Sequence, residues 1–364
     1  MGFGDKSLKK LFFVNIFALT GILLFFFYSS LLFSAAEKSF FLFAGENLIV
    51  QQVSNFLLLW IFPMFSVLTG ICAAKLLSDS EIKKYVLIVV KSLLIPFATG
   101  MIIFVPFQIF TGMRTAGSDM AFKTLPAYYQ HLSAYFNNGG IIFLSNFWIF
   151  FYLAASCFVL LFCRPLLVKF NLNDVNVHFI LIFVSGFVFF LKPVFFFNNA
   201  ADFLDIFLPF MYGAFLFQYE NVQEKVKRNR HWLFACFLAI FCFNVFLAFS
   251  ERYGNALTRH LVSRALIWLG LLAGIAVFKR YFDKTNGFMN TIAECTVFNM
   301  YSALTLVIAV ALVAMRFITN QYVLFFVVAI VAFLLSLFIR MLLGRFKTMQ
   351  LLFGMRSELY NEII

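Results

Sequence analysis

Charged residues are scarce in this sequence. Only 12% of its 364 residues are charged, whereas a soluble domain of this length carries roughly a quarter. Hydrophobic residues make up 63%, and apolar runs long enough to cross a hydrocarbon core of about 30 Å recur from end to end. Backbone groups must be hydrogen-bonded within lipid, and the runs are far longer than the ~10-residue alternating strands of a barrel. The sequence therefore predicts an all-α, polytopic membrane helical bundle, formed as one domain over residues 1–364.

Residues that form disulfides or bind metals are also few. The six cysteines all fall within or at the ends of apolar runs and form no CxxC pair, which argues against a disulfide framework. The four histidines are scattered without ligand spacing, so we expect no metal site. The sequence contains no Gly-rich phosphate loop, HExxH motif or nucleophile elbow. The 57 phenylalanines are interpreted as lipid-facing bulk rather than as a ligand channel.

The apolar runs predict about ten membrane-spanning helices. The first run is too long for a signal peptide and is not followed by a small-residue cleavage pattern, so it is interpreted as an anchor. The predicted spans are approximately 11–35, 48–77, 85–111, 141–167, 175–197, 200–218, 232–250, 263–282, 290–315 and 320–343.

Lysine and arginine lie mainly on one side of this predicted membrane topology. They gather before the first span and in alternate connections after it, including the last one. Positively charged connections remain in the cytoplasm, so both termini are predicted to be cytoplasmic and the protein to lie in a bacterial-type inner membrane. The cluster EKVKRNRH (224–231) is predicted to be a loop held against anionic membrane lipids rather than a nucleic-acid site. The outer loop 111–140 predicts an interfacial helix or, alternatively, a sugar-stacking platform.

Six stretches of the chain resemble motifs of the membrane acyltransferase-3 family. They occur in the family's order and at about its spacing, and the nearest branch resembles the one that succinylates periplasmic glucans. The resemblance therefore covers essentially the whole chain. The stretches are WIFPMFSVLTGICAAKLL (60–77), KKYVLIVVKSLLIPF (83–97), LSNFWIFFYL (144–153), FLPFMYGAFLF (207–217), IAECTVFNMYSALTL (292–306) and RFKTMQLLFG (345–354).

The resemblance implies about ten helices around an intramembrane site. There an acyl group from a cytoplasmic donor, usually a coenzyme A thioester, would be transferred to a sugar hydroxyl on the far side. Such chemistry needs a general base, and histidine suits because its pKa lies near neutrality. In this chain the family's first-span histidine position is Ser29, within FFFYSSLLF (25–33). The aspartate fourteen residues earlier is Asn15, and the arginine of that Asp-x-x-Arg pattern is Ala18.

The other family motifs have also lost their ionisable residues. His-x-Trp-Phe becomes Asn146-Phe147-Trp148-Ile149, and the histidine of the ninth span becomes Tyr301 or Leu304, depending on register. The Arg-x-x-Arg pair falls on Val89 and Ser92, with only Lys91 nearby. The replacements predict either a vestigial binding pocket or small polar residues that mediate helix packing. The predicted pocket comprises Asn15, Ser29, Ser30, Lys91, Asn146, Trp148 and Tyr301.

A second group of ionisable residues is predicted at the outer surface, in SERYGNALTRHLVSR (250–264). It could hold an anionic sugar or lipid head group by charge-assisted hydrogen bonds, or it could be a solvated loop. Asp202 or Asp205 is predicted to form a structural salt bridge with Arg259 or Arg264. The residues of this outer cluster are Glu251, Arg252, Arg259, His260 and Arg264.

From the resemblance we expect a protein that acts in acyl modification, or in export, of an extracytoplasmic or cell-surface glycan. Because the expected base, acid and cations are replaced together, we expect a binding or scaffold subunit that works with other glycan-synthesis or export subunits. An acyl-coenzyme A donor is implied by the resemblance alone. The alternatives are a transporter or flippase of a lipid-linked sugar, and an active acyltransferase with a relocated site.

Overall fold

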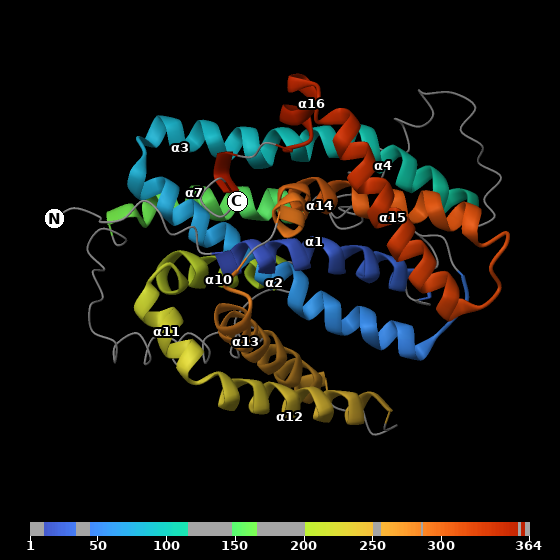
Figure 1. The fold of residues 1–364 in the computed structure, drawn as a ribbon, viewed down its shortest axis with the longest axis horizontal. Helices are drawn as coiled ribbons and strands as arrows, with labels where there is room; N and C mark the ends of the chain where they lie inside the picture. The colour runs from blue at the N-terminus through green and yellow to red at the C-terminus, as the bar shows by residue number, and fades with distance from the viewer. Residues whose placement is uncertain are drawn as a thin grey trace.

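The computed structural model describes residues 11–33, 44–115, 148–165, 201–249, 256–284, 287–355 and 358–360. All regular elements in these ranges are helices, and most of the long ones run side by side along the length of the molecule (Figure 1). In chain order, the elements are α1 (Leu11–Leu31), α2 (Leu48–Asp79), α3 (Ile82–Val89), η2 (Val90–Leu94), α4 (Ile95–Thr115), α7 (Trp148–Phe162), α10 (Ala201–Tyr212), η4 (Gly213–Phe217), α11 (Glu220–Arg228), α12 (Arg230–Phe249), α13 (Ala256–Tyr281), α14 (Gly287–Ala314), α15 (Gln321–Leu343), α16 (Lys347–Leu352) and η5 (Glu358–Tyr360).

Seven helices of the described chain are long and apolar enough to cross a membrane. They correspond to predicted spans one, two, three, seven, eight, nine and ten. Spans four and six correspond to shorter apolar helices, Trp148–Phe162 and Phe203–Phe217, and span five (175–197) lies outside the described residues. The chain is thus a multi-pass helical membrane protein. Its long spans are Phe12–Leu31, Leu48–Asp79, Ile82–Gln108, Arg230–Leu247, Leu261–Tyr281, Gly287–Ala314 and Gln321–Leu343.

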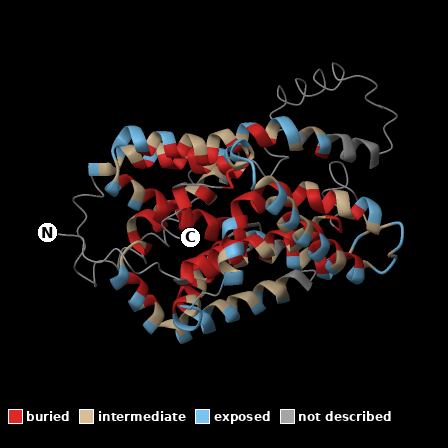
Figure 2. Cartoon of the chain, turned by 45° about the horizontal axis from the view of Figure 1, so that its top comes forward, coloured by how far each residue is buried: buried red, intermediate tan, exposed pale blue. Residues whose placement is uncertain are grey.

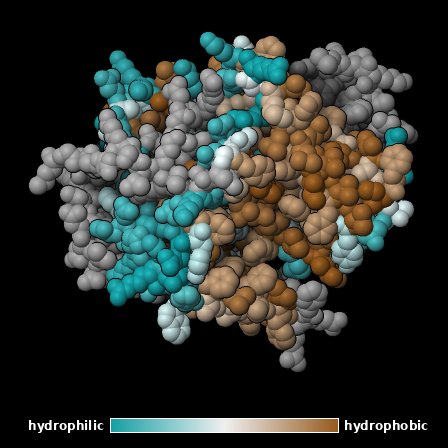
Figure 3. All heavy atoms as spheres, viewed as in Figure 1, coloured by the Kyte–Doolittle hydropathy of each residue, from teal (hydrophilic) through white to brown (hydrophobic). Residues whose placement is uncertain are grey.

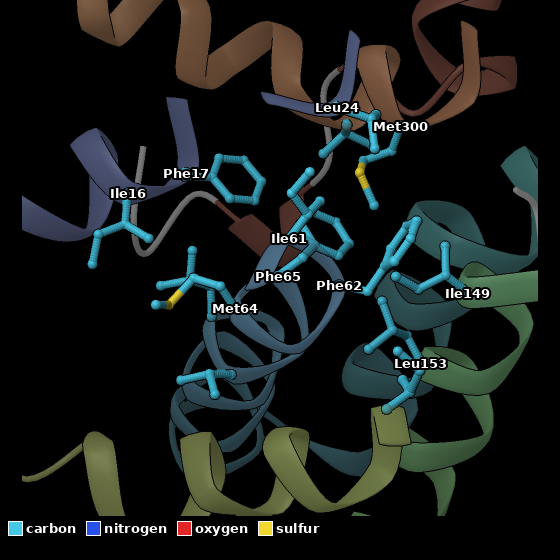
Figure 4. Packing of buried hydrophobic residues seen from close by; sticks show 14 of the residues in the cluster. Ile16, Phe17, Leu24, Ile61, Phe62, Met64, Phe65, Ile149, Leu153 and Met300 are labelled. Atoms are coloured by element: carbon cyan, nitrogen blue, oxygen red, sulfur yellow. The ribbon is translucent and has the colours of Figure 1, made fainter. Parts of the chain in front are cut away.

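α1 lies at the centre of the bundle, where it packs against α14, α2 and α15. It carries no charged residue and has no polar face, which is the pattern of a helix buried on all sides. Figure 2 shows that buried residues concentrate in the central helices. Close by, Phe17 of α1 stacks on Phe65 of α2 with ring centroids 5.6 Å apart, and Phe62 lies beside Ile149 of α7 (Figure 4).

Two glycines bring α2 into direct backbone contact with α10 and η4. A Cβ atom on Gly70 would collide with the carbonyl oxygen of Phe210, and one on Gly213 would collide with that of Val67. Small residues at such positions let membrane helices approach closely without a hydrophobic driving force between them. Both glycines fall within stretches that carry the acyltransferase-3 resemblance, and here they have a packing role.

The segment predicted as a basic loop, 224–231, is mostly helical. α11 covers Glu220–Arg228, and α12 begins at Arg230 after a single turn residue. The prediction of a loop was wrong because α11 is amphipathic. Val222 and Val226, four residues apart, are buried on one face together with Gln223, while charged residues and Asn221 occupy the rest.

The C-terminal residues return into the bundle after α16. Gly354 has a positive φ of 59°, which lets the chain turn back sharply. Tyr360 is then fully buried between Phe17 of α1 and Phe65 of α2, with ring centroids 5.1 Å and 5.8 Å away. Its hydroxyl lies 3.0 Å from Thr69 Oγ1. The chain's own C-terminal segment therefore fills part of the space between α1 and α2.

Candidate functional site

Ser29 and Ser30 are fully buried, and both hydroxyls are hydrogen-bonded. Ser29 Oγ donates to the carbonyl oxygen of Phe325 in α15 at 2.8 Å. Ser30 Oγ donates to Phe27 O within α1, at 2.5 Å. In lipid a buried hydroxyl needs such a partner. Ser29 thus links two neighbouring helices, and the partner of its hydroxyl is a carbonyl, which cannot act as a base at neutral pH.

Asn15 lies near the opposite end of α1. Its Nδ2 atom donates to Phe282 O at 2.6 Å and to Lys284 O at 3.0 Å, just after α13 ends. Asn15 thereby ties the start of α1 to the connection that follows α13. Fourteen residues of helix separate Asn15 from Ser29, which is about 21 Å at 1.5 Å per residue. The two side chains therefore serve different contacts at different depths.

The remaining residues of the predicted pocket are distributed over other helices. Trp148, at the start of α7, packs on Phe62 with ring centroids 5.6 Å apart. Tyr301 of α14 is fully buried and stacks on Phe150 of α7 at 4.5 Å. Lys91 is half-buried in η2, and Asn146 lies outside the described residues. Trp148 and Tyr301 thus both lie in contacts made by α7, whereas Asn15 and Ser29 bond to other elements.

A line of buried polar side chains between α1, α14 and α15 was not predicted from the sequence. Thr296 Oγ1 donates to Phe17 O at 3.0 Å, and Ser336 Oγ donates to Asn299 Oδ1 at 2.6 Å. Ser302 Oγ lies 3.4 Å from Ser336 Oγ. Gly21 of α1 leaves space for the Thr296 side chain, since a Cβ at residue 21 would lie 2.6 Å from Thr296 Oγ1. We call Thr296, Asn299, Ser302 and Ser336 the polar seam.

The polar seam holds no group that titrates near neutrality. It is built from hydroxyls and one amide, all almost completely buried. Asn299 Nδ2 has no hydrogen-bond partner in the described part of the chain. The sequence signal that could have found the seam is the three-residue spacing of Thr296, Asn299 and Ser302, which places them on one face of a helix. The seam's hydroxyls and amide suit helix association.

Of the outer cluster, the structure describes one side chain in detail. Arg264 of α13 forms a two-pronged ion pair with Asp205 of α10. One guanidinium nitrogen contacts Asp205 Oδ1, and Nη2 lies 3.1 Å from Oδ2. The predicted salt bridge is thereby confirmed for this pair. Arg259 and His260 lie in α13, but their side chains are outside the described structure, as are residues Glu251 and Arg252.

At the other end of α13, Lys279 joins the bundle to α11. The Lys279 side chain is 5% exposed, and its Nζ atom lies 2.9 Å from Glu224 Oε1 and 3.9 Å from Glu220 Oε1. Gln223 Oε1 accepts a further hydrogen bond from Nζ at 3.2 Å. The hydrogen bond from Lys279 is the main reason that the pKa of Glu224 is lowered, although desolvation opposes it. This cluster orients α11 against the bundle.

The cysteines lie at different depths in the structure. None of the six cysteines, all within the described ranges, forms a disulfide: Cys72, Cys157 and Cys295 are buried, Cys163 is partly buried, and Cys236 and Cys242 are exposed. Among the described residues, no group of three His, Cys, Asp or Glu side chains is arranged to hold a metal ion. Most of the buried polar residues described above bond to a different element, whereas Ser30 bonds within α1. The ionised ones, Arg264 and Lys279, pair with carboxylates of α10 and α11.

No family model, no curated protein and no solved structure matches this chain.

Proposed function

We propose that the chain is a multi-pass protein of a bacterial-type inner membrane, with about ten spans and both termini in the cytoplasm. The asymmetric distribution of lysine and arginine supports this orientation. The described basic residues include Lys83 and Lys84 in α3 and four more between 225 and 230. A reporter fused after Ile364 tests it: activity in the cytoplasm is expected, and an extracytoplasmic reporter would contradict the topology.

We further propose that the protein acts in acyl modification or export of an extracytoplasmic glycan, as a binding or scaffold subunit and not as the acyl-transfer catalyst. The family resemblance supports the glycan context. The observation that carries the non-catalytic role is the hydrogen bond from Ser29, at the family's histidine position, to the Phe325 carbonyl. A serine hydroxyl needs an adjacent base to act as a nucleophile, and the apolar runs of spans one to four contain no His, Asp or Glu.

The loss of a single general base typically lowers a rate by about 10²–10⁴. Here Asn15 stands at the family's acid position and bonds to two backbone carbonyls, so it serves a structural contact as well. Acyl transfer through these positions would therefore need a base supplied from elsewhere. Two alternatives do not use these positions: an active enzyme with a relocated site, and a flippase gated by the outer cluster. In the second of these, Arg264 would first have to leave Asp205.

The test combines cells and purified protein. Deletion of the gene is expected to change the acylation or the surface amount of a glycan, measured by mass spectrometry. Purified full-length protein is expected to transfer no acyl group from an acyl-coenzyme A to a sugar acceptor. Turnover by the purified protein would refute the non-catalytic role. Loss of the glycan from the surface with its acylation pattern unchanged would favour the transporter instead.

A further inference from the structure

A hollow of about 770 Å³ lies at the surface where α11, the turn at Asn229, the start of α12 and the end of α13 meet. Five cationic side chains line it, with one carboxylate, that of Glu224. Arg280 enters from α13, some fifty residues along the chain from the others. We call this site the basic hollow. Its cations are Lys225, Lys227, Arg228, Arg230 and Arg280.

The one carboxylate of the basic hollow, Glu224, forms an ion pair with Lys279, which does not line the hollow. Glu224 accepts a hydrogen bond from the buried Lys279 at 2.9 Å, and Lys227 lies 3.2 Å from its other oxygen. Lys279 also lies near Glu220, so the acidic residues of α11 turn toward α13. The hollow's lining thus sets five cations against this one carboxylate, which already pairs with Lys279 and Lys227.

One guanidinium of the hollow has unused hydrogen-bonding capacity. The Arg230 Nε atom is buried and has no hydrogen-bond partner among the described residues. Nη1 of the same side chain makes only a long bond of 3.4 Å, to Lys227 O. Arg228 and Arg280 are exposed. Arginine donors arranged in this way match the oxygens of a phosphate group, which accept two parallel N–H bonds.

The surroundings of the hollow indicate where the phosphate comes from. α12 leaves the hollow along the outside of the bundle, and none of residues 230–247 is buried. Trp232, one turn into α12, is 76% exposed, as expected for an aromatic residue at a membrane interface. Figure 3 shows hydrophilic side chains gathered over α11, next to the largely apolar surface of α12. A ligand with a charged head and apolar tails fits this boundary.

We propose that the basic hollow binds the phosphate headgroup of an anionic phospholipid, whose acyl chains lie along α12. The volume falls within the range of about 300–1,000 Å³ that small-molecule sites occupy. The inference goes beyond a general attraction of basic loops to an anionic leaflet, because it specifies one site built from three elements. It uses the proposed orientation only to place the hollow in the cytoplasmic leaflet, and its test does not depend on glycan function.

The experiment titrates delipidated full-length protein in a neutral detergent with phosphatidylglycerol or phosphatidylcholine, and counts bound lipids by native mass spectrometry. Wild type is expected to retain one phosphatidylglycerol in preference to phosphatidylcholine. The double variant Arg228→Gln/Arg280→Gln should weaken this binding at least about tenfold. The matched control, Lys83→Gln/Lys84→Gln, removes two exposed charges from α3 outside the hollow and should bind as wild type does.

Three outcomes would overturn the proposal. One is equal weakening by the control variant, which would show unspecific surface attraction. Another is binding of pyrophosphate as tight as that of phosphatidylglycerol, which would identify a soluble phosphate ligand. The third concerns the side chains themselves: Arg228→Lys/Arg280→Lys keeps the charges but not the parallel N–H donors, so its binding should lie between those of the wild type and of the glutamine variant. Binding by the glutamine variant as tight as that of the wild type, at an unchanged thermal midpoint, would show that these side chains do not hold the lipid.

Discussion

Gly213→Ala is expected to force α2 and η4 apart. The new methyl group would overlap the carbonyl oxygen of Val67, which belongs to a helix backbone and cannot rotate away as a side chain could. A second close contact, Gly70 against Phe210 O, ties α2 to α10, which continues directly into η4. The overlap with Val67 O can therefore be relieved only by moving whole helices, which would weaken the packing between them.

Insertion of one methyl group into a well-packed core typically destabilises by about 1–3 kcal/mol. We expect Gly213→Ala to lie at the upper end of this range, because the obstacle is backbone. The matched control is Gly287→Ala: Gly287 is the first residue of α14, and a Cβ there meets nothing within 4 Å. That substitution should be neutral or slightly stabilising, since alanine is the better helix former.

The assay is thermal unfolding of the purified proteins in detergent, followed with a thiol-reactive fluorophore. Cys72 and Cys157 are buried and react only when the bundle opens, whereas Cys236 and Cys242 supply a constant background. Gly213→Ala should lower the midpoint by several degrees relative to Gly287→Ala. Equal midpoints would refute the close backbone approach of α2 and η4.

Further predictions concern the polar contacts. Glu224 has a lowered pKa in the folded protein, so its contribution to stability is present above its ordinary pKa of 4.5 and is lost as the pH falls through the lowered pKa. The difference in melting temperature between wild type and Glu224→Gln should therefore become smaller as the pH is lowered from 4.5 through that pKa. Asp205→Asn should destabilise more than the double variant with Arg264→Gln, because the single change leaves a largely buried guanidinium without its carboxylate; equal midpoints would contradict this. Tyr360→Phe should lower stability by about 0.5–1.5 kcal/mol, the value of one hydrogen bond, while Tyr360→Ala should cost about 3–5 kcal/mol in the same unfolding assay.

The spans were predictable because lipid imposes length and hydrophobicity on each helix separately. The tenth span was expected at 320–343, and α15 runs from Gln321 to Leu343, after Asn320 caps its N-terminus. α11 was not predicted because five of its nine residues are charged, which is typical of a solvated loop. The only sign of a helix in the sequence is the four-residue spacing of Val222 and Val226. The hydrophobic pattern of a segment is thus informative for features that depend on one helix alone, such as where a span begins and ends.

The contacts of the candidate site depend on pairs of helices. Nothing near Ser29 in the sequence indicates that its partner is a backbone carbonyl 296 residues away. The polar seam likewise joins Asn299 to Ser336 across 37 residues. A sequence shows which polar residues an apolar helix carries, but the neighbours they face are set by packing. The ion pair of Arg264 with Asp205 could be predicted because two opposite charges near the same membrane surface have few other partners to pair with.

The central claim is that Ser29 is a structural link and not a catalyst. Its direct test is Ser29→Ala, with Ser30→Ala as the control that removes a hydrogen bond within α1 only. The glycan whose acylation depends on the gene is analysed by mass spectrometry in cells with matched protein levels. We predict unchanged acylation for both variants and a loss of stability for Ser29→Ala of about 0.5–1.5 kcal/mol. Acylation abolished by Ser29→Ala alone, with the protein folded and inserted at normal abundance, would contradict the claim.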